Sequence, residues 1–200
     1  IYLLRELLKS TNAKIYCLIR KGEFDTAAKR LLATINKFHL ENDVSLNDRR
    51  IIAIASDLSA DNFGLPVEQY NSLLEKIDLI YHCGAQVNIM ASYNKLRGSN
   101  VIGTLEVIKF ATTRYDKPIH YISTLSSAYQ KDAEGSLSEV FPEASYEELS
   151  GGYAISKWVA ERLLTEVKDR GLPVQIYRSG YISGQSDTGQ ANFNDSLFML

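Results

Sequence analysis

PIHYIST, residues 118–124, is a short run of mostly apolar and β-branched residues that ends in a serine and a threonine. It lies between helical patterns of apolar residues at 100–115 and 150–169. Similar apolar runs lie at 13–20, 50–56, 78–86 and 173–180, and further helical patterns lie at 25–40 and 67–77. Near-continuously apolar strands are typical of a parallel sheet that is covered on both faces. The order of elements therefore predicts an α/β fold with a doubly wound parallel sheet.

The composition is that of an ordinary globular protein, because 45% of the 200 residues are hydrophobic and 23% are charged. This length suits a single domain, residues 1–200. The net charge of −2, with both signs interspersed, gives no argument for a nucleic-acid surface. No apolar run approaches the roughly 20 residues that cross a bilayer, so no membrane span is expected.

The two cysteines, Cys17 and Cys83, lie in apolar, strand-like runs. They lack the spacing of metal ligands, and so do the three histidines, so no metal site is expected. We expect both cysteines to be buried free thiols, as in a reducing compartment such as the cytoplasm.

Small or polar residues stand where the predicted strands end. Ligands of doubly wound sheets collect at the carboxyl ends of the strands, so these positions are candidates for a binding site. They are Arg20, Asp57, Leu58, Gly84, Ala85, Ser123, Thr124, Ser179 and Gly180.

Tyr153 and Lys157 are four residues apart on the predicted helix, so both side chains share one face. A free tyrosine has a pKa of about 10, and a neighbouring ammonium group favours the phenolate and lowers that pKa. Tyr153 could then protonate a carbonyl oxygen while hydride reaches the carbonyl carbon. The alternative is a packed aromatic ring beside a surface amine.

The chain begins inside a helical pattern, with no strand and no glycine turn before it. A dinucleotide-binding fold needs that turn, because the pyrophosphate rests there on a helix N-terminus. Either the fold is a different one, or the sequence is a fragment without its first strand. The segment NDSLFML (194–200), which stops without a terminating signal, agrees with a fragment.

The chain resembles the extended short-chain dehydrogenase/reductases, and within them the thioester reductase domains. Such domains end non-ribosomal peptide synthetases, polyketide synthases and carboxylic acid reductases. The matching stretches follow the family's order, and they include IYCLIR, IIAIASDLS, LIYHCGAQVN, HYIST, GGYAISKWVAE and RGLPVQIYRSGYISG. The family's glycine loop would lie upstream of Ile1, and Ser179 stands where the family usually has proline.

The resemblance implies a catalytic set of Thr124, Tyr153 and Lys157. Thr124 could donate to the same carbonyl oxygen, in the manner of an oxyanion hole. Ser123 and Ser126 are rival candidates, although hydroxyls at a strand end also satisfy backbone groups. Lys157 would also contact the nicotinamide ribose.

Cofactor preference is implied by two arginines. Arg20 follows a strand at the position where an acidic residue would hold a ribose 2′-hydroxyl, and arginine there accommodates a 2′-phosphate. Arg30 is the family's usual second phosphate contact, although it could equally be a solvated basic residue. Asn100 is a plausible helix N-cap, at a position where the family uses asparagine to support the active site. The full set expected to bind NADPH is Arg20, Arg30, Asp57, Leu58, Gly84, Ala85, Ser123, Tyr153, Lys157, Ser179, Gly180 and Ile182.

The implied function is NADPH-dependent reduction of an acyl thioester, held on the phosphopantetheine arm of a carrier protein, to an aldehyde or alcohol. One alternative keeps the fold and changes the substrate, as in a fatty acyl-CoA reductase or a nucleotide-sugar epimerase or dehydratase. Another alternative is a non-catalytic NADP-binding sensor or scaffold, and the intact Tyr153 and Lys157 pair argues against it.

Overall fold

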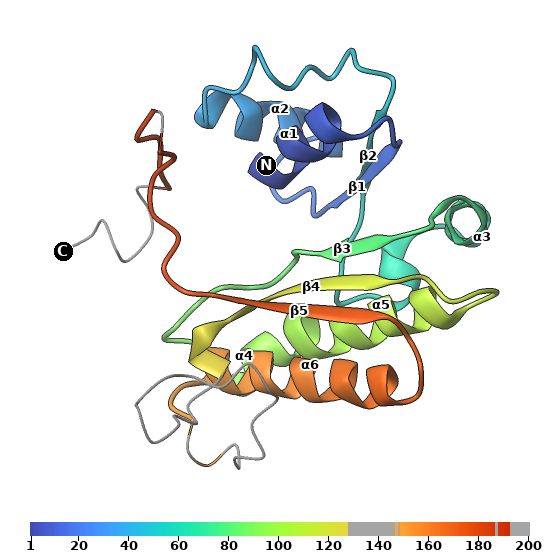
Figure 1. Cartoon of the computed structure of the whole chain (residues 1–200), viewed down its shortest axis with the longest axis vertical. Coiled ribbons are helices and arrows are strands. Elements are labelled where there is room, and N and C mark those ends of the chain that lie inside the picture. The colour runs from blue at the N-terminus through green and yellow to red at the C-terminus, as the bar shows by residue number, and fades with distance from the viewer. Residues whose placement is uncertain (128–146, 148, 187, 193–200) are drawn as a thin grey trace. The chain divides into compact units, whose positions relative to one another are not determined.

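The computed structural model describes residues 1–127, 147, 149–186 and 188–192 (Figure 1). The chain divides into two compact units, one made of Ile1–Asp57 with Tyr181–Leu200 and the other of Leu58–Gly180. Both units combine helices with parallel strands, which confirms the predicted α/β class. The expectation that residues 1–200 form a single domain stays a prediction. The stretch 194–200 lies outside the described residues.

The described part of the first unit contains two helices and a two-stranded parallel sheet. Its elements are α1 (Tyr2–Ser10), β1 (Ile15–Ile19), α2 (Ala27–Lys37) and β2 (Ile51–Ala55). β1 and β2 pair in parallel, with Ile15 opposite Ile51 and Ile19 opposite Ala55. The buried core is made of Leu4 and Leu8 on α1, Leu31 and Ile35 on α2, and Leu40 and Val44 in the segment after α2.

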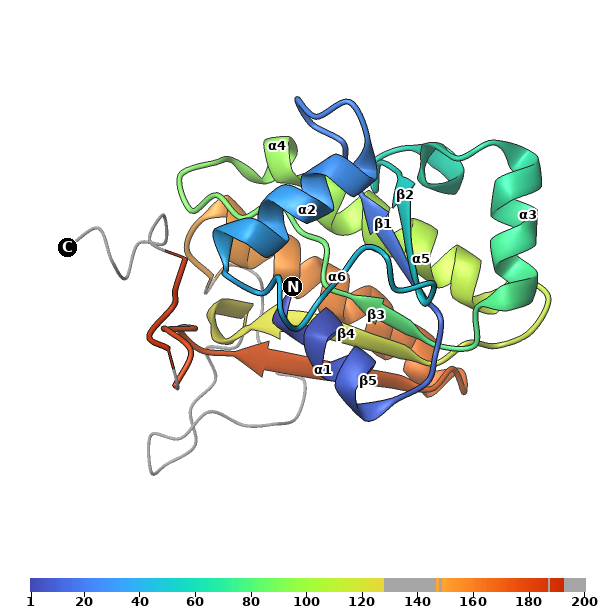
Figure 2. The same ribbon diagram turned by 90° about the horizontal axis from the view of Figure 1, so that it is seen from above.

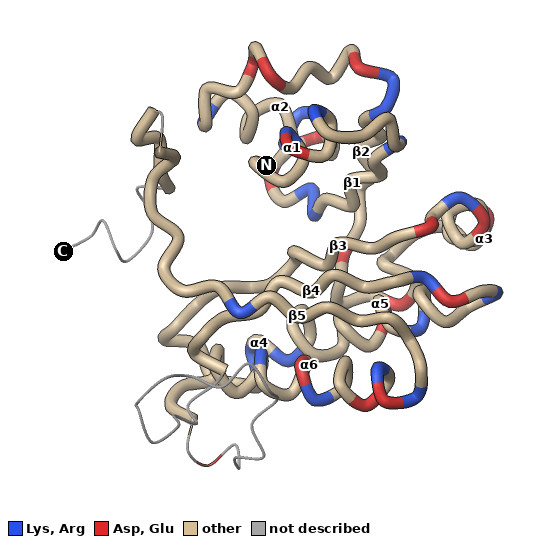
Figure 3. Tube along the Cα trace, viewed as in Figure 1, with Lys and Arg blue, Asp and Glu red and all other residues tan. Residues whose placement is uncertain are grey.

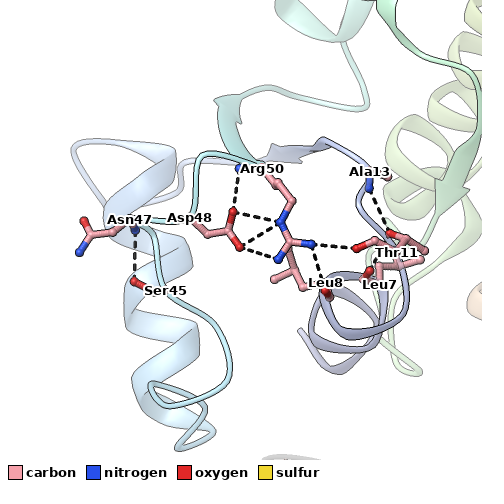
Figure 4. A network of polar contacts seen from close by, with 8 residues as sticks. All are labelled: Leu7, Leu8, Thr11, Ala13, Ser45, Asn47, Asp48 and Arg50. Carbon is pink, nitrogen blue, oxygen red and sulfur yellow. Dashed lines mark hydrogen bonds and ion pairs between the residues drawn. The ribbon is translucent and has the colours of Figure 1, made fainter.

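Arg50 ties the start of β2 to the end of α1 (Figure 4). Its Nη1 donates to the carbonyl oxygens of Leu8 at 3.0 Å and Thr11 at 2.8 Å. Its Nε and Nη2 bind the carboxylate of Asp48 at 2.7–3.1 Å. The guanidinium therefore satisfies carbonyl groups that the end of a helix leaves without intrahelical partners.

The second unit contains a three-stranded parallel sheet in the order β3-β4-β5. The strands are β3 (Ile80–His82), β4 (Ile119–Thr124) and β5 (Val174–Ser179), and Thr124 lies opposite Ser179 at the end of the sheet. The helices α5 (Gly103–Thr112) and α6 (Gly152–Asp169) lie on one side of this sheet, as Figures 1 and 2 show. The other elements are η1 (Asp61–Gly64), α3 (Val67–Lys76), α4 (Tyr93–Arg97), the π-helical η2 (Gly98–Ile102) and η3 (Leu125–Ser127).

The helical pattern predicted at 100–115 begins earlier than expected. α4, η2 and α5 follow one another without a gap from Tyr93 to Thr112, so Asn100 lies inside a helical segment. The prediction that Asn100 is a helix N-cap is therefore wrong, because the backbone before it is already helical. Its side chain is buried, and the residue belongs to the π turn, a form that is rare within helices.

Basic and acidic residues are interspersed along both units (Figure 3). Within the described ranges, no helix is long and apolar enough to span a membrane.

Both cysteines are free, but Cys17 is only half-buried and Cys83 is exposed, so the prediction of two buried thiols is wrong. The apolar run predicts a strand through Cys83, but β3 ends one residue earlier, at His82.

Candidate active site

Tyr153 lies in the first turn of α6, and two glycines bring that turn into place. Gly151 has a φ of +85°, a conformation that side chains with a Cβ rarely adopt. A Cβ at Gly152 would lie 2.3 Å from the backbone nitrogen of Tyr93 and 2.5 Å from the carbonyl oxygen of Ala91. The start of α6 can therefore pack this closely against residues 91–93 only because position 152 is glycine.

Asn100 fixes the same turn from the inside. Its Oδ1 accepts a hydrogen bond from Gln86 N at 2.7 Å, and its Nδ2 donates to Gln86 O at 3.1 Å and to Ser156 Oγ at 2.9 Å. Ser156 Oγ in turn donates to the carbonyl oxygen of Tyr153 at 2.8 Å. The amide thus joins the segment after β3 to the helical turn that carries Tyr153.

Lys157 is buried, with only 2% of its surface exposed. Its Nζ donates to the carbonyl oxygen of Ile122 at 2.7 Å and lies 4.0 Å from the centre of the Tyr121 ring. Burial lowers the pKa of Lys157 to about 8, and the neighbouring Glu161 and Cys83 oppose that shift. The alternative of a surface amine is therefore wrong for Lys157.

The expected effect of Lys157 on Tyr153 differs from what the structure shows. The sequence predicts that the ammonium group lowers the pKa of Tyr153, but burial of the half-buried ring raises that pKa. The physical reason is that the low-dielectric surroundings disfavour the phenolate, while Lys157 directs its charge to Ile122 and Tyr121 on β4.

The hydroxyls at the end of β4 differ in their partners. Ser123 is buried and donates to the Glu161 carboxylate. Thr124 is half-buried, and its Oγ1 accepts from the backbone nitrogen of Ser126 at 3.2 Å. A hydroxyl that accepts one bond keeps its own proton for donation. Thr124 therefore fits a donor to substrate better than Ser123, whereas Ser126 is exposed on the turn that follows.

Leu58 is enclosed by two glycines. A Cβ at Gly84 would lie 2.4 Å from Leu58 Cδ1, and one at Gly103 would lie 3.0 Å from both the Cβ and the carbonyl oxygen of Leu58. A side chain at position 84 would therefore require Leu58 Cδ1 to move, whereas one at position 103 would meet the backbone of Leu58. Ala85 continues the same segment and is half-buried.

The end of β5 joins the end of β4. Ser179 Oγ donates to the carbonyl oxygen of Ser123 at 3.2 Å, and Gly180 follows as an exposed residue. α6 packs against β4, β5 and η3, so the second unit brings Ser123, Thr124, Tyr153, Lys157 and Ser179 to one group of packed elements. Sequence reasoning missed Glu161 and Arg178, which bind each other in this region. The spacing of Glu161, four residues after Lys157, was the available signal.

The first unit holds the remaining predicted residues. Arg20 is exposed directly after β1, and Nη1 of Arg30 on α2 donates to the carbonyl oxygen of Arg20. Arg20, in the loop after β1, and Arg30, near the start of α2, therefore contact each other. Asp57 follows β2 and is exposed, as is Ile182. Paired arginines beside a strand end are a donor set that fits a phosphate group.

Comparisons with known proteins identify the family of the chain. The family described as male sterility protein, an NAD-binding domain family, matches residues 1–200. A linear gramicidin synthase of Brevibacillus parabrevis is 37% identical over 202 residues, which cover 100% of this chain and 4% of that protein.

Two solved structures are also similar. The terminal R domain of the myxalamid PKS-NRPS pathway has a TM-score of 0.86 and 36% identity, over 98% of this chain and 50% of that chain. A thiolation-reductase di-domain of an archaeal non-ribosomal peptide synthetase has a TM-score of 0.78 and 29% identity, over 99% and 54%. This chain therefore spans about half the length of these solved structures. By the match over all 200 residues, the chain belongs to the male sterility protein family of NAD-binding domains.

Proposed function

We propose that this chain is part of an NADPH-dependent oxidoreductase that reduces a carrier-protein-bound acyl thioester to an aldehyde or alcohol. The observation that carries the proposal is the position of Tyr153 and Lys157 on α6, which packs against the end of β4 where Thr124 lies. The similarity to a terminal R domain and to a thiolation-reductase di-domain supports the reaction class and a carrier protein as partner.

Tyr153, Thr124 and Lys157 would perform the proton chemistry. When bound, NADPH would supply the hydride for the thioester carbon, and the phosphopantetheine thiol would leave as the carbon–sulfur bond breaks. Tyr153 would give its proton to the carbonyl oxygen, and its raised pKa keeps the phenol protonated until the oxygen gains charge. Thr124 would donate a hydrogen bond to the same oxygen, because its own proton remains available. Lys157 would supply a buried positive charge on the same face of α6 as the phenol.

The cofactor-binding residues would divide their roles by chemistry. Arg20 and Arg30 would hold a 2′-phosphate, which is the reason to expect NADPH rather than NADH. Asp57 and Leu58 would line the adenine, the carboxylate accepting from its amino group. Backbone and small side chains would contact the rest of the cofactor, at Gly84, Ala85, Ser123, Ser179, Gly180 and Ile182. The free thiols of Cys17 and Cys83 support a cytoplasmic location.

The proposal is tested with the full-length protein, NADPH and an acyl group loaded on the phosphopantetheine arm of a carrier protein. We expect cofactor oxidation together with an aldehyde that a hydrazine reagent traps, or the alcohol. The matched comparison uses the same acyl group on coenzyme A. Faster reduction of acyl-CoA would instead indicate a fatty acyl-CoA reductase. NADPH binding without turnover on either substrate would indicate a sensor or scaffold.

A further inference from the structure

We propose that Glu161 is the positioning residue that fixes α6 against the ends of β4 and β5, through a buried network with Ser123, Ser127 and Arg178. The inference rests on the proposed function, because it concerns the placement of Tyr153 and Lys157 relative to Thr124. Glu161 would touch neither substrate nor cofactor, and it would act through the residues that do.

The Glu161 side chain is fully buried and both its oxygens have partners. Oε1 accepts from Ser123 Oγ and from Ser127 Oγ, the latter at 2.6 Å. Oε2 accepts from Arg178 Nε at 2.9 Å and from Arg178 Nη2 at 2.8 Å. A buried carboxylate is tolerated when it is paired and hydrogen-bonded in this way. The two hydrogen bonds from Arg178 fix the orientation of the guanidinium relative to the carboxylate, in addition to the distance between them.

The partners of Glu161 lead directly to the end of β4. Ser127 Oγ lies 2.6 Å from Glu161 Oε1 and 2.7 Å from the carbonyl oxygen of Thr124, so its single proton is shared between the carboxylate and the backbone of the proposed oxyanion donor. Ser179 Oγ, next to Arg178, donates to the carbonyl oxygen of Ser123. The network thus holds α6, β4, η3 and β5 together at the level of Thr124.

The spacing on α6 explains why an anchor at position 161 controls the reacting residues. Tyr153, Lys157 and Glu161 are separated by four residues each, so they share one face of the helix. Asn100 anchors the first turn through Ser156, and Glu161 anchors the helix two turns later. Lys157 therefore lies between the two buried anchor points, Ser156 and Glu161, and Tyr153 is held by the hydrogen bond from Ser156 Oγ to its carbonyl oxygen.

The charge of Glu161 also reaches Lys157. The titratable and charged groups that face Lys157 are Glu161 on α6, His82 on β3, Cys83 directly after β3, and Tyr121 on β4. Arg178 on β5 is bound to Glu161. Burial lowers the pKa of Lys157, and Glu161 is the largest effect that opposes it. Neutralising Glu161 leaves Arg178 without its negatively charged partner on α6. It also lowers the pKa of Lys157 further, because the negative charge that raises this pKa is lost.

The test compares Glu161→Gln with Glu166→Gln. Glu166 lies on the same helix and pairs with Arg170 at 2.7 Å, but both side chains are exposed, so this substitution controls for the loss of a charge and an ion pair. We expect Glu161→Gln to lower kcat by about tenfold to a hundredfold, the effect of slight misplacement, with NADPH affinity within a few-fold of wild type. We expect Glu166→Gln to match wild type in both.

A second readout is independent of turnover. Titration of Lys157 by NMR with labelled lysine should give a midpoint of about 8 in the wild type. It should give a lower midpoint in Glu161→Gln and no change in Glu166→Gln. Equal behaviour of the two variants in kcat and in this titration would overturn the inference. If the wild type proves inactive, the proposed function fails, and the titration alone still decides whether Glu161 sets the surroundings of Lys157.

Glu161→Gln could also fail to fold, which circular dichroism would reveal. Ser127→Ala then decides, because it keeps the pair of Glu161 and Arg178 while it removes the hydroxyl that reaches Thr124 O. We expect a folded variant with a several-fold loss of kcat and an unchanged Lys157 midpoint. Wild-type kcat in Ser127→Ala would contradict a positioning role for the network.

Discussion

The Nζ of Lys157 donates a hydrogen bond to the carbonyl oxygen of Ile122 at 2.7 Å. This contact joins the middle of α6 to the strand that ends in Thr124, and it takes place in the protein interior. Lys157 thus links the helix to the strand. Its burial lowers its pKa to about 8, so the ammonium group loses its proton more easily than that of an exposed lysine.

Activity should fall as the pH rises through about 8, because Lys157 loses its proton there. The sign follows from the lowered pKa of Lys157: the ammonium form is present below that value and lost above it. Lys157→Ala should lower turnover and NADPH affinity together, and its pH–rate profile should lack this alkaline limb. Lys168→Ala, on the exposed side of the same helix, is the control and should keep the limb. A limb that persists in Lys157→Ala would assign it to another group.

Cofactor preference should depend on the two arginines of the first unit. Hydrogen bonds to charged groups contribute roughly 1.5–3 kcal/mol each, so Arg20→Ala should weaken NADPH binding by about tenfold or more. NADH binding should barely change, because NADH carries no 2′-phosphate. Arg30→Ala should act in the same direction with a smaller effect, and it also removes the contact with the Arg20 carbonyl.

Titration of both cofactors at fixed salt measures this difference. Lys29→Ala, which removes an exposed charge beside Arg30, is the matched control and should leave both affinities unchanged. Equal losses of NADH and NADPH affinity in Arg20→Ala would mean that Arg20 supports the loop instead of recognising the phosphate.

Gly152→Ala should destabilise the protein and displace Tyr153. The new Cβ would lie 2.3 Å from Tyr93 N, which requires a backbone shift, so the free energy of unfolding should fall by about 1–3 kcal/mol or more. Gly98→Ala is the control, because its Cβ would meet only Ser59 Cβ at 3.6 Å, an ordinary contact. That substitution should be neutral or stabilise by about 0.4–1 kcal/mol. Denaturant unfolding distinguishes the two, and similar curves for both variants would contradict the close packing at Gly152.

Much of the fold follows from local pattern, whereas the buried polar groups do not. Apolar runs predicted all five described strands, and the four-residue spacing placed Tyr153 and Lys157 on one helix. The burial of Glu161 could not be predicted, because a glutamate on an amphipathic helix normally faces water. Its partner Arg178 lies 17 residues away on another element.

Two other differences have the same origin. The π turn at Gly98–Ile102, which contains the buried Asn100, cannot be recognised from the spacing of apolar residues. The pKa of Tyr153 is raised because the fold buries the ring. The four-residue spacing between Tyr153 and Lys157 gives no information about that burial.

The most direct test of the account is reduction of a carrier-bound acyl thioester by the wild type and by Tyr153→Phe, measured as trapped aldehyde or alcohol per enzyme. The substitution keeps the half-buried ring and removes only the hydroxyl that would donate the proton. The account predicts product from the wild type, loss of product in Tyr153→Phe, and NADPH affinity within a few-fold of wild type. Near wild-type turnover in Tyr153→Phe would contradict the assignment of Tyr153 as the proton donor.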